Sequence, residues 1–272
     1  MRILEKPLVP ASEMSASNDP SSAPSPEFSP LSFAEELSVP LPVYKAASTS
    51  NFDIDGLLSS PLRLHEDLTN GCGGQTWPAG MVLAKHMLRY HREDLRDARI
   101  LELGAGGGLV GLAVAKGCQV QSEHPMIITD QDEMFHLMGH NIGLNNLEDR
   151  VKHLILNWGE PLPEAVVNLK PNVILAADCV YFEPAFPLLQ LTLSDLFALN
   201  EDATVYFCFK KRRRADPKFL KKAQKMFLVE EVFDADRPVF SRETLFLYTF
   251  KKKTQKQAAP PKKAEEGSTA PQ

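Results

Sequence analysis

The strongest chemical signal in the chain is a glycine-rich segment that directly follows a short apolar run. Residues 100–103 read Ile-Leu-Glu-Leu, and residues 104–108 read Gly-Ala-Gly-Gly-Gly before an amphipathic stretch begins. The pattern is typical of a buried strand that ends in a tight turn and leads into a helix. Glycine lets a ligand approach bare backbone, and the first turn of a helix presents free N–H groups. We therefore expect a nucleotide-like cofactor at this turn.

The glycine spacing alone does not identify the cofactor. Counted from Gly104 the pattern is GxGxG, with Leu109 where a dinucleotide fingerprint needs its third glycine. Counted from Gly106, GxGxxG fits, but it begins two residues beyond the end of the apolar run. A glycine turn that binds no ligand is the remaining alternative, so the neighbouring residues must decide.

A carboxylate ends the second strand-like run. Asp130 follows Gly104 by 26 residues, and a carboxylate beside the glycine turn can accept both hydroxyls of a ribose. The alternative is a helix cap, because Asp132 and Glu133 suit the first turn of a helix. Both roles can coexist.

Two tryptophans stand in loop-like segments. Trp158 follows the third strand-like run, and Trp77 lies in the glycine-rich block GCGGQTWPAG. Either ring could flank a flat purine, and either could instead serve ordinary packing. The sequence leaves both readings open.

An acidic and a phenolic side chain follow the fourth strand-like run, at Asp178 and Tyr181. In open α/β sheets the ligand crevice lies outside the carboxyl ends of the strands, so this pair could hold a cationic substrate beside the cofactor. Alternatively, Asp178 caps a turn while Tyr181 packs in the core, and the local pattern alone favours that alternative.

Two other patterns carry weaker signals. The basic run from Lys210 to Arg214 follows the fifth strand-like run; we expect it on the same rim as Asp178, facing an acidic partner surface, with a solvated loop or a nuclear signal as alternatives. His136 and His140 have a zinc-compatible i, i+4 spacing, but Leu137 replaces the glutamate of a metalloprotease and no third ligand is evident. We expect no metal.

Composition excludes several classes of protein. The formal net charge of −5 gives no case for direct nucleic-acid binding. No apolar run is long enough to span a bilayer, and the N-terminus lacks the apolar core of a secretory signal. Four scattered cysteines are typical of free thiols in a reducing compartment. Neither a GxSxG elbow nor a GxxxxGK[ST] phosphate loop is present. We expect a cytoplasmic monomer, with a nuclear pool as the alternative.

The elements that must position these residues alternate along the chain. Strand-like runs cover 99–103, 126–130, 151–156, 172–178 and 203–209, and helix-like stretches cover 107–116, 131–144 and 185–199. A helix-like piece after Pro217 precedes two further β-rich runs, at 226–233 and 244–250. This order predicts an α/β, Rossmann-like, doubly wound sheet that is mostly parallel and is closed by an antiparallel C-terminal hairpin. The helix at 131–144 is the least secure, because it contains Gly139 and Gly143.

Segments at both ends fall outside this pattern. Residues 11–31 are rich in Ser, Pro and Ala, and residues 251–272 form a polar, lysine-rich tail. Such sequences bury too little apolar surface to offset chain entropy. We expect residues 1–61 to be largely disordered, residues 62–250 to form one catalytic domain, and residues 251–272 to be a disordered basic tail.

Five blocks, in order, resemble the class I (seven-β-strand) S-adenosylmethionine-dependent methyltransferases, and within them the intracellular protein-lysine methyltransferases. The blocks are GCGGQTWPAG, ILELGAGGGLVGL, ITDQDE, NWGE and LAADCVYFEPAFPLLQLTLSDL. Together with a further block, FKKRRRADPKF, they resemble the fungal members that modify translation elongation factor 1-alpha. The resemblance covers roughly residues 62–250 and implies a seven-stranded sheet.

Carried over position by position, the resemblance implies roles for ten residues. The cofactor, S-adenosyl-L-methionine, would contact Trp77, Glu102, Gly104, Ala105, Gly106, Asp130, Trp158 and Ala177. Glu102 would lie under the turn near the methionine moiety, and Asp178 and Tyr181 would form the catalytic, substrate-side motif. Gly107 is a departure, since many relatives have threonine or serine there.

The resemblance implies direct, in-line methyl transfer to a lysine of a protein substrate, elongation factor 1-alpha. Two rival functions remain at this stage. A nicotinamide-dependent oxidoreductase would need a catalytic acid such as a Tyr/Lys pair, which the sequence does not reveal. A catalytically silent scaffold would bind the translation machinery through its basic loop.

Overall fold

A computed structural model of the chain describes residues 46–120, 123–213 and 215–254. The chain divides into a unit of residues 1–44, which lies outside the described residues, and a unit of residues 45–272. The Ser/Pro-rich segment 11–31 and most of the C-terminal tail also lie outside the described residues, and the predictions of disorder there stay predictions.

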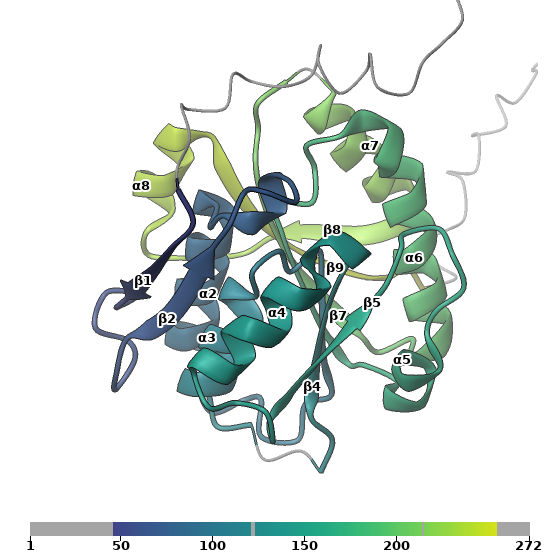
Figure 1. Cartoon of the computed structure of the whole chain (residues 1–272). Coiled ribbons are helices and arrows are strands. Elements are labelled where there is room, and N and C mark those ends of the chain that lie inside the picture. Colours follow the sequence, from purple (N-terminus) through teal and green to yellow (C-terminus); the bar gives the residue numbers. More distant parts are fainter. Residues whose placement is uncertain (1–45, 121–122, 214, 255–272) are drawn as a thin grey trace, which may run out of the picture. The chain divides into compact units, whose positions relative to one another are not determined.

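A seven-stranded sheet forms the centre of the described unit (Figure 1). Its strands are β3 (Ile100–Leu103), β4 (Met126–Asp130), β5 (Val151–Ile155), β6 (Val173–Ala177), β7 (Thr204–Lys210), β8 (Phe227–Glu231) and β9 (Leu245–Lys252). The strands lie in the order β5-β4-β3-β6-β7-β9-β8. Strands β3 to β7 are parallel, and β9 pairs antiparallel with both β7 and β8. The predicted doubly wound sheet and its C-terminal hairpin are confirmed.

Helices cover both faces of the sheet. Helices α2 (Pro78–Tyr90), α3 (Leu109–Gly117) and α4 (Asp132–Leu144) share one buried cluster with Ile100 and Ile128. Helices α5 (Glu164–Leu169), α6 (Phe186–Leu199) and α7 (Asp216–Met226) share the other with Leu101 and Leu103. Successive side chains of a strand point to opposite faces, so a strand buried on both sides reads as a continuous apolar run.

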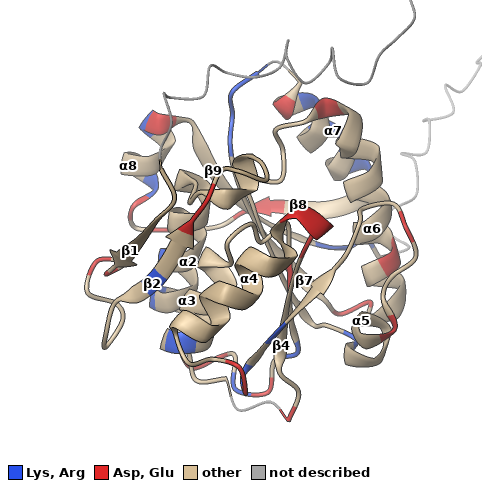
Figure 2. Ribbon diagram, in the orientation of Figure 1, with Lys and Arg blue, Asp and Glu red and all other residues tan. Residues whose placement is uncertain are grey.

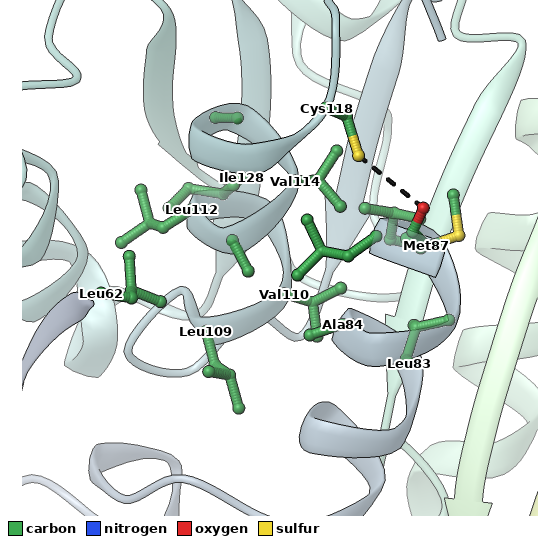
Figure 3. Packing of buried hydrophobic residues seen from close by; sticks show 14 of the residues in the cluster. Leu62, Leu83, Ala84, Met87, Leu109, Val110, Leu112, Val114, Cys118 and Ile128 are labelled. Atoms are coloured by element: carbon green, nitrogen blue, oxygen red, sulfur yellow. Dashed lines mark hydrogen bonds between the residues drawn. The ribbon is translucent and has the colours of Figure 1, made fainter. Parts of the chain in front are cut away.

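Helix α3, which begins directly after the glycine turn, packs against α2 through buried apolar side chains (Figure 3). Leu83 and Met87 of α2 and Val110 and Val114 of α3 are at most 2% exposed. The Cys118 thiol donates a hydrogen bond to the carbonyl oxygen of Met87 at 3.8 Å. Truncating one such side chain to alanine costs about 2–5 kcal/mol. The helix that begins after the turn is therefore held rigidly against its neighbour.

A two-stranded hairpin, β1 (Ser48–Phe52) with β2 (Leu62–Glu66), was not expected from the sequence. Strand β1 lies inside the range 1–61 that we expected to be largely disordered. Leu62 and Leu64 lie on one face of β2, are at most 1% exposed, and pack in the same buried cluster as α2 and α3. The packed unit thus begins before residue 62, and strand β9 extends two residues into the predicted tail.

Side-chain amides of Asn141 in α4 and of Asn145, its C-cap residue, bond the backbone of β2. Asn145 accepts a bond from the Arg63 backbone N–H at 2.9 Å and donates one to the Arg63 carbonyl at 2.7 Å. Asn141 does the same for His65, at 2.7 and 3.1 Å. The two asparagines, one helical turn apart, satisfy backbone N–H and C=O groups of β2 that would otherwise need a neighbouring strand. Helix α4 therefore holds β2 in place, although α4 contains Gly139 and Gly143.

The remaining elements are short. They are η1 (Cys72–Gly74), η2 (Glu183–Ala185), α8 (Arg237–Phe240) and η3 (Ser241–Glu243). Across the described ranges, no helix is both long and apolar enough to cross a membrane.

Candidate active site

The strand order reverses at β3, which lies between β4 and β6. The chain runs outward from β3 to β4 and β5 on one side, and to β6 and β7 on the other. A crevice at the carboxyl ends of the strands is expected at such a switch point. The glycine turn follows β3, Asp130 ends β4 and Asp178 follows β6, so the fold gathers three of the predicted features at one place.

The glycine turn is built for close backbone approach. Gly104 and Gly106 have φ values of +60° and +55°, which L-residues with side chains adopt at a cost. A Cβ on Gly106 would lie 2.5 Å from the carbonyl oxygen of Gly73. The η1 loop therefore contacts the turn directly, and only glycine fits at position 106.

Asp130 fastens this turn to the end of β4. One carboxylate oxygen accepts the backbone N–H of Gly106 and the other that of Gln131, each at 2.7 Å. Burial raises the pKa of the Asp130 carboxyl, partly offset by these two hydrogen bonds. The residue at the N-cap position of α4 is Gln131, which makes no side-chain cap bond. The carboxylate keeps unused lone pairs, so the ribose role stays a prediction that the geometry accommodates.

Glu102 lies beneath the turn, where the resemblance predicts it. The residue is 2% exposed, and its Oε2 accepts a hydrogen bond from the backbone N–H of Gly111 at 2.8 Å. Burial raises the pKa of this carboxyl to about 8. Glu102 thus anchors the first turns of α3, and any contact with a cofactor stays a prediction.

The two tryptophans lie at different parts of the crevice. The Trp158 ring is next to Gly104, since its Cζ2 would be 3.1 Å from a Cβ at that glycine. Trp77 immediately precedes α2, and its Nε1 donates a hydrogen bond to the Cys72 carbonyl at 2.9 Å. Both rings are half-buried, and Trp158 packs partly against the second core cluster. Packing and ligand contact are therefore compatible for Trp158.

Asp178 is held in an unusual local conformation. Its φ is +58°, a left-handed value that is uncommon outside glycine, although Asp tolerates it better than most residues. Its backbone N–H bonds to the Cys208 carbonyl at 2.8 Å, which extends the pairing of β6 with β7. Such strained residues are enriched at functional sites.

The carboxylate of Asp178 makes a two-point ion pair with Arg212. Oδ1 accepts from Nη1 at 2.7 Å and Oδ2 accepts from Nη2 at 2.6 Å. The guanidinium carbon of Arg212 also lies 5.3 Å from the centroid of the Trp77 ring. The sequence-based interpretation of Asp178 as a turn cap is wrong, because its oxygens bind the β7–α7 loop instead.

Tyr181 is not a core residue either, since it is 45% exposed. Its hydroxyl faces the Cys72 thiol, and desolvation there, together with Cys72 and Asp130, raises the pKa of the phenol. The exposed part of the residue is therefore the ring, while the hydroxyl end reaches toward the η1 loop. Asp178 and Tyr181 both follow β6 at the carboxyl edge of the sheet, and their catalytic, substrate-side roles stay predictions.

The basic loop differs from its expected role in one respect. Lys211 is exposed, as expected of a residue that faces a partner, but the Arg212 guanidinium turns inward to Asp178 (Figure 2 shows the Lys and Arg positions in blue). Arg214 lies outside the described residues. The Arg212–Asp178 ion pair was not predicted from the sequence. The signal that could have revealed it is the predicted position of the basic loop and Asp178 on one rim of the sheet.

A pocket of about 430 Å³ adjoins Trp77. Its wall combines the start of α2, the α8–η3 segment and Leu245, which pairs with Lys210 at the carboxyl end of β7. Met81, Val82 and Val239 make it partly apolar, and Lys85 and Glu243 add charge.

The histidine pair and the cysteines form no further site. The His140 ring lies 5.1 Å from that of His65, in an edge-to-face arrangement. Within the described part of the chain, no group of three potential metal ligands comes together. All four cysteines are free thiols.

A mostly parallel seven-stranded sheet of this order, closed by an antiparallel hairpin, is a Rossmann-like, doubly wound α/β fold. Comparison with solved structures finds the mitomycin 7-O-methyltransferase MmcR (TM-score 0.47, 12% identity, 64% of this chain and 53% of that chain). It also finds an S-adenosylhomocysteine-bound methyltransferase of Podospora anserina, PaMTH1 (TM-score 0.42, 14% identity, 64% and 78%).

Sequence comparison identifies the family. Residues 57–226 match the lysine methyltransferase family. The chain is 36% identical over 219 residues to protein-lysine N-methyltransferase EFM6 of Saccharomyces cerevisiae, covering 73% of this chain and 88% of that protein. It is 33% identical over 193 residues to protein N-lysine methyltransferase METTL21A of Danio rerio, covering 67% and 82%. The chain belongs to the lysine methyltransferase family and is an enzyme of the protein-lysine N-methyltransferase class.

Proposed function

We propose that the enzyme transfers a methyl group directly, in line, from S-adenosyl-L-methionine to a lysine of translation elongation factor 1-alpha. The observation that carries the proposal is the position of the Asp178 carboxylate, after β6 and across the switch point from the glycine turn after β3. An acidic group and a glycine turn at the same edge of the sheet support a substrate side and a cofactor side that face each other.

The residues around the turn fit the cofactor. Asp130 has lone pairs left for ribose hydroxyls, the Trp158 ring lies beside Gly104, and Ala105 and Gly106 are only half-buried. Ala177 is the last residue of β6 and precedes Asp178. When bound, S-adenosyl-L-methionine would supply an electrophilic methyl group on a positively charged sulfur.

The attacking amine must be neutral, and this sets the task of the substrate side. A lysine with a pKa near 10.4 is neutral in roughly one molecule in 2,500 at pH 7, a handicap of about 4.6 kcal/mol. A bare carboxylate beside it would favour the ammonium form. The role of Asp178 is therefore orientation: it accepts one N–H of the amine and aims the nitrogen lone pair at the methyl group, with the proton lost to water before attack.

Tyr181 contributes from the same rim. Its hydroxyl is directed to the η1 loop, and its raised pKa keeps it protonated at neutral pH. Its exposed ring and the Trp77 face can line the alkyl stem of an entering lysine. The pocket beside Trp77 gives the segments flanking that lysine a place to lie.

Support for elongation factor 1-alpha is the resemblance of the GCGG, AADCVY and FKKRRRADPKF blocks to fungal members of the family. The test is incubation of the purified factor with methyl-labelled S-adenosyl-L-methionine, followed by peptide mapping. We expect label on one lysine with wild-type enzyme and about 100-fold slower labelling of the same lysine with Asp178→Asn. Efficient wild-type labelling of other proteins, with none on this factor, would refute the substrate while leaving the reaction intact.

A further inference from the structure

We propose that Arg212 is a positioning residue for methyl transfer: it holds the Asp178 carboxylate in place and cancels its charge, so that the lysine is oriented without being kept protonated. This inference deepens the proposed function and rests on it. It gives the basic loop after β7 a role inside the active site.

The contact itself is specific. Both carboxylate oxygens of Asp178 meet both terminal nitrogens of Arg212, at 2.7 and 2.6 Å, the parallel geometry that lysine cannot reproduce. The Asp178 side chain is 6% exposed and the Arg212 side chain 25%. Ion pairs on an open surface contribute little, but a pair this covered is screened far less by solvent.

The loop is built to present this arginine. The Asp216 carboxylate, fully buried, accepts the backbone N–H of Arg212 at 2.7 Å and that of Arg213 at 2.9 Å. On the other side, Lys211 and Thr244 exchange two hydrogen bonds, at 2.8 and 2.9 Å. The backbone of Arg212 is exposed while its side chain is covered, so the loop is anchored on both sides of an inward-pointing guanidinium.

Trp77 limits where the guanidinium can go. Its ring faces Arg212 at 5.3 Å, and its own Nε1 is tied to the η1 loop. A cation over an indole face is favoured by about 0.5–2 kcal/mol. Three separate elements, β6, the β7–α7 loop and the segment before α2, therefore converge on one position of the Arg212 side chain.

The surrounding charges make Arg212 the natural counter-ion of Asp178. The nearby Cys179 and Cys208 are neutral thiols, because burial raises their pKa values well above the ordinary value. The Lys210 backbone N–H is 3.4 Å from Oδ1 of Asp178. Asp216 lies behind Arg212 at the first position of α7, where helix N–H groups offset its charge.

Cys72 of the η1 loop also lies close enough to influence the pKa values of both Arg212 and Tyr181.

The pair still leaves Asp178 able to bind an amine. An ionised carboxylate has about four acceptor positions, of which Arg212 takes two and the Lys210 backbone N–H, at 3.4 Å, a third, so one position stays free for the amine. A lysine that donates to a free position meets an ion pair whose net charge is near zero instead of a bare anion. Removing the guanidinium would restore the anion and raise the pKa of the bound amine. Transfer would then need a higher pH.

The experiment measures kcat and KM on elongation factor 1-alpha across pH 6.5 to 9 for wild type, Arg212→Gln, Arg212→Lys and Lys211→Gln. We expect the kcat of Arg212→Gln to be about tenfold below that of wild type at neutral pH. The acidic side of its kcat–pH profile should lie about one pH unit higher than in wild type. The difference in kcat between the two enzymes should therefore be smaller at pH 9. Arg212→Lys keeps the positive charge but not the two-point contact, so it should restore the wild-type pH profile and only part of the lost rate. Lys211→Gln removes an exposed charge of the same loop that does not contact Asp178, so its kcat and pH profile should match wild type, and any change should be confined to KM.

A double variant tests whether Arg212 acts through Asp178. In an Asp178→Asn background there is no charge to cancel, so adding Arg212→Gln should cost less than threefold further. Thermal unfolding and S-adenosylhomocysteine affinity of each variant guard against a simple loss of folding, and Arg212→Lys supplies a second variant if Arg212→Gln does not fold.

Three outcomes would overturn the inference. An Arg212→Gln enzyme as fast as wild type, or faster, would mean that the substrate displaces Arg212. A uniform loss with an unmoved pH profile would mean a purely structural role. A wild-type enzyme that methylates no lysine would refute the proposed function as well, whereas the first two leave that function standing.

Discussion

The Asp130 carboxylate and the Gly106 backbone N–H are joined by a 2.7 Å hydrogen bond that ties the end of β4 to the turn after β3. Asp130 is the last residue of β4, and Gly106 lies in the turn that follows the neighbouring parallel strand β3. One carboxylate thereby shapes the turn and, in the proposed function, receives the ribose of the cofactor. Turn geometry and cofactor affinity should therefore change together.

Replacing Asp130 by alanine should weaken S-adenosylhomocysteine binding by at least about tenfold, since ribose contacts and turn geometry are both lost. Unfolding free energy should fall by only about 1–2 kcal/mol. Calorimetric titration measures the affinity. Asp132→Ala, an exposed carboxylate in the first turn of α4, is the matched control and should bind normally. Equal affinity in both variants would rule out the ribose role.

Gly106→Ala should destabilise the enzyme by about 2–4 kcal/mol and abolish cofactor binding. The new methyl would lie 2.5 Å from the Gly73 carbonyl, in a left-handed backbone conformation. Gly143→Ala is the contrasting variant: its Cβ meets only Glu148, at 3.6 Å, in a helix. That change should stabilise by about 0.5–1 kcal/mol. Chemical denaturation gives both values, and a tolerated alanine at 106 would contradict the tight contact.

Glu102 should make stability depend on pH. Its pKa is raised from 4.5 to about 8 in the folded enzyme, chiefly by burial. The unfolded chain releases this proton first as pH rises, so the folded state loses stability between pH 4.5 and 8. Glu102→Gln cannot titrate, and its stability relative to wild type should improve by on the order of 3 kcal/mol from pH 5 to 8. Denaturation curves of both proteins at pH 5 and 8 measure this difference in stability. The same pH dependence in both proteins would refute the raised pKa of Glu102.

Asp178→Asn should separate catalysis from cofactor binding. Asparagine keeps the shape and tolerates the left-handed φ, but it removes the charge that binds Arg212 and orients the amine. We expect kcat to fall by about 100-fold with S-adenosylhomocysteine affinity changed less than about threefold. Steady-state kinetics and calorimetry on the same preparation test this. Full methylation of the true substrate by Asp178→Asn would refute the orienting role.

The sheet was predictable because its strands carry strong local signals. The run Met126–Asp130 begins after Pro125 and ends where α4 starts, and its predicted bounds match β4. The β1–β2 hairpin was not predictable, because β1 has little apolar character and depends on β2, which in turn depends on the side-chain amides of Asn141 and Asn145. Local periodicity does not report such tertiary partners.

The candidate site divides in the same way. The glycine turn, Asp130 and Asp178 were found because they follow strands, and the carboxyl ends of parallel strands meet at one edge. The orientation of Arg212 was missed, because a run of basic residues usually faces solvent. Its inward direction depends on the buried Asp216 carboxylate and on Trp77, which is far away in sequence.

The most direct measurement is a crystal structure of the enzyme soaked with S-adenosylhomocysteine. We expect the ribose on Asp130, the adenine along Trp158, and the sulfur on the side of the crevice that faces Asp178 and Tyr181. A crevice that stays closed by its own side chains, or a ligand bound elsewhere on the molecule, would contradict the proposed active site.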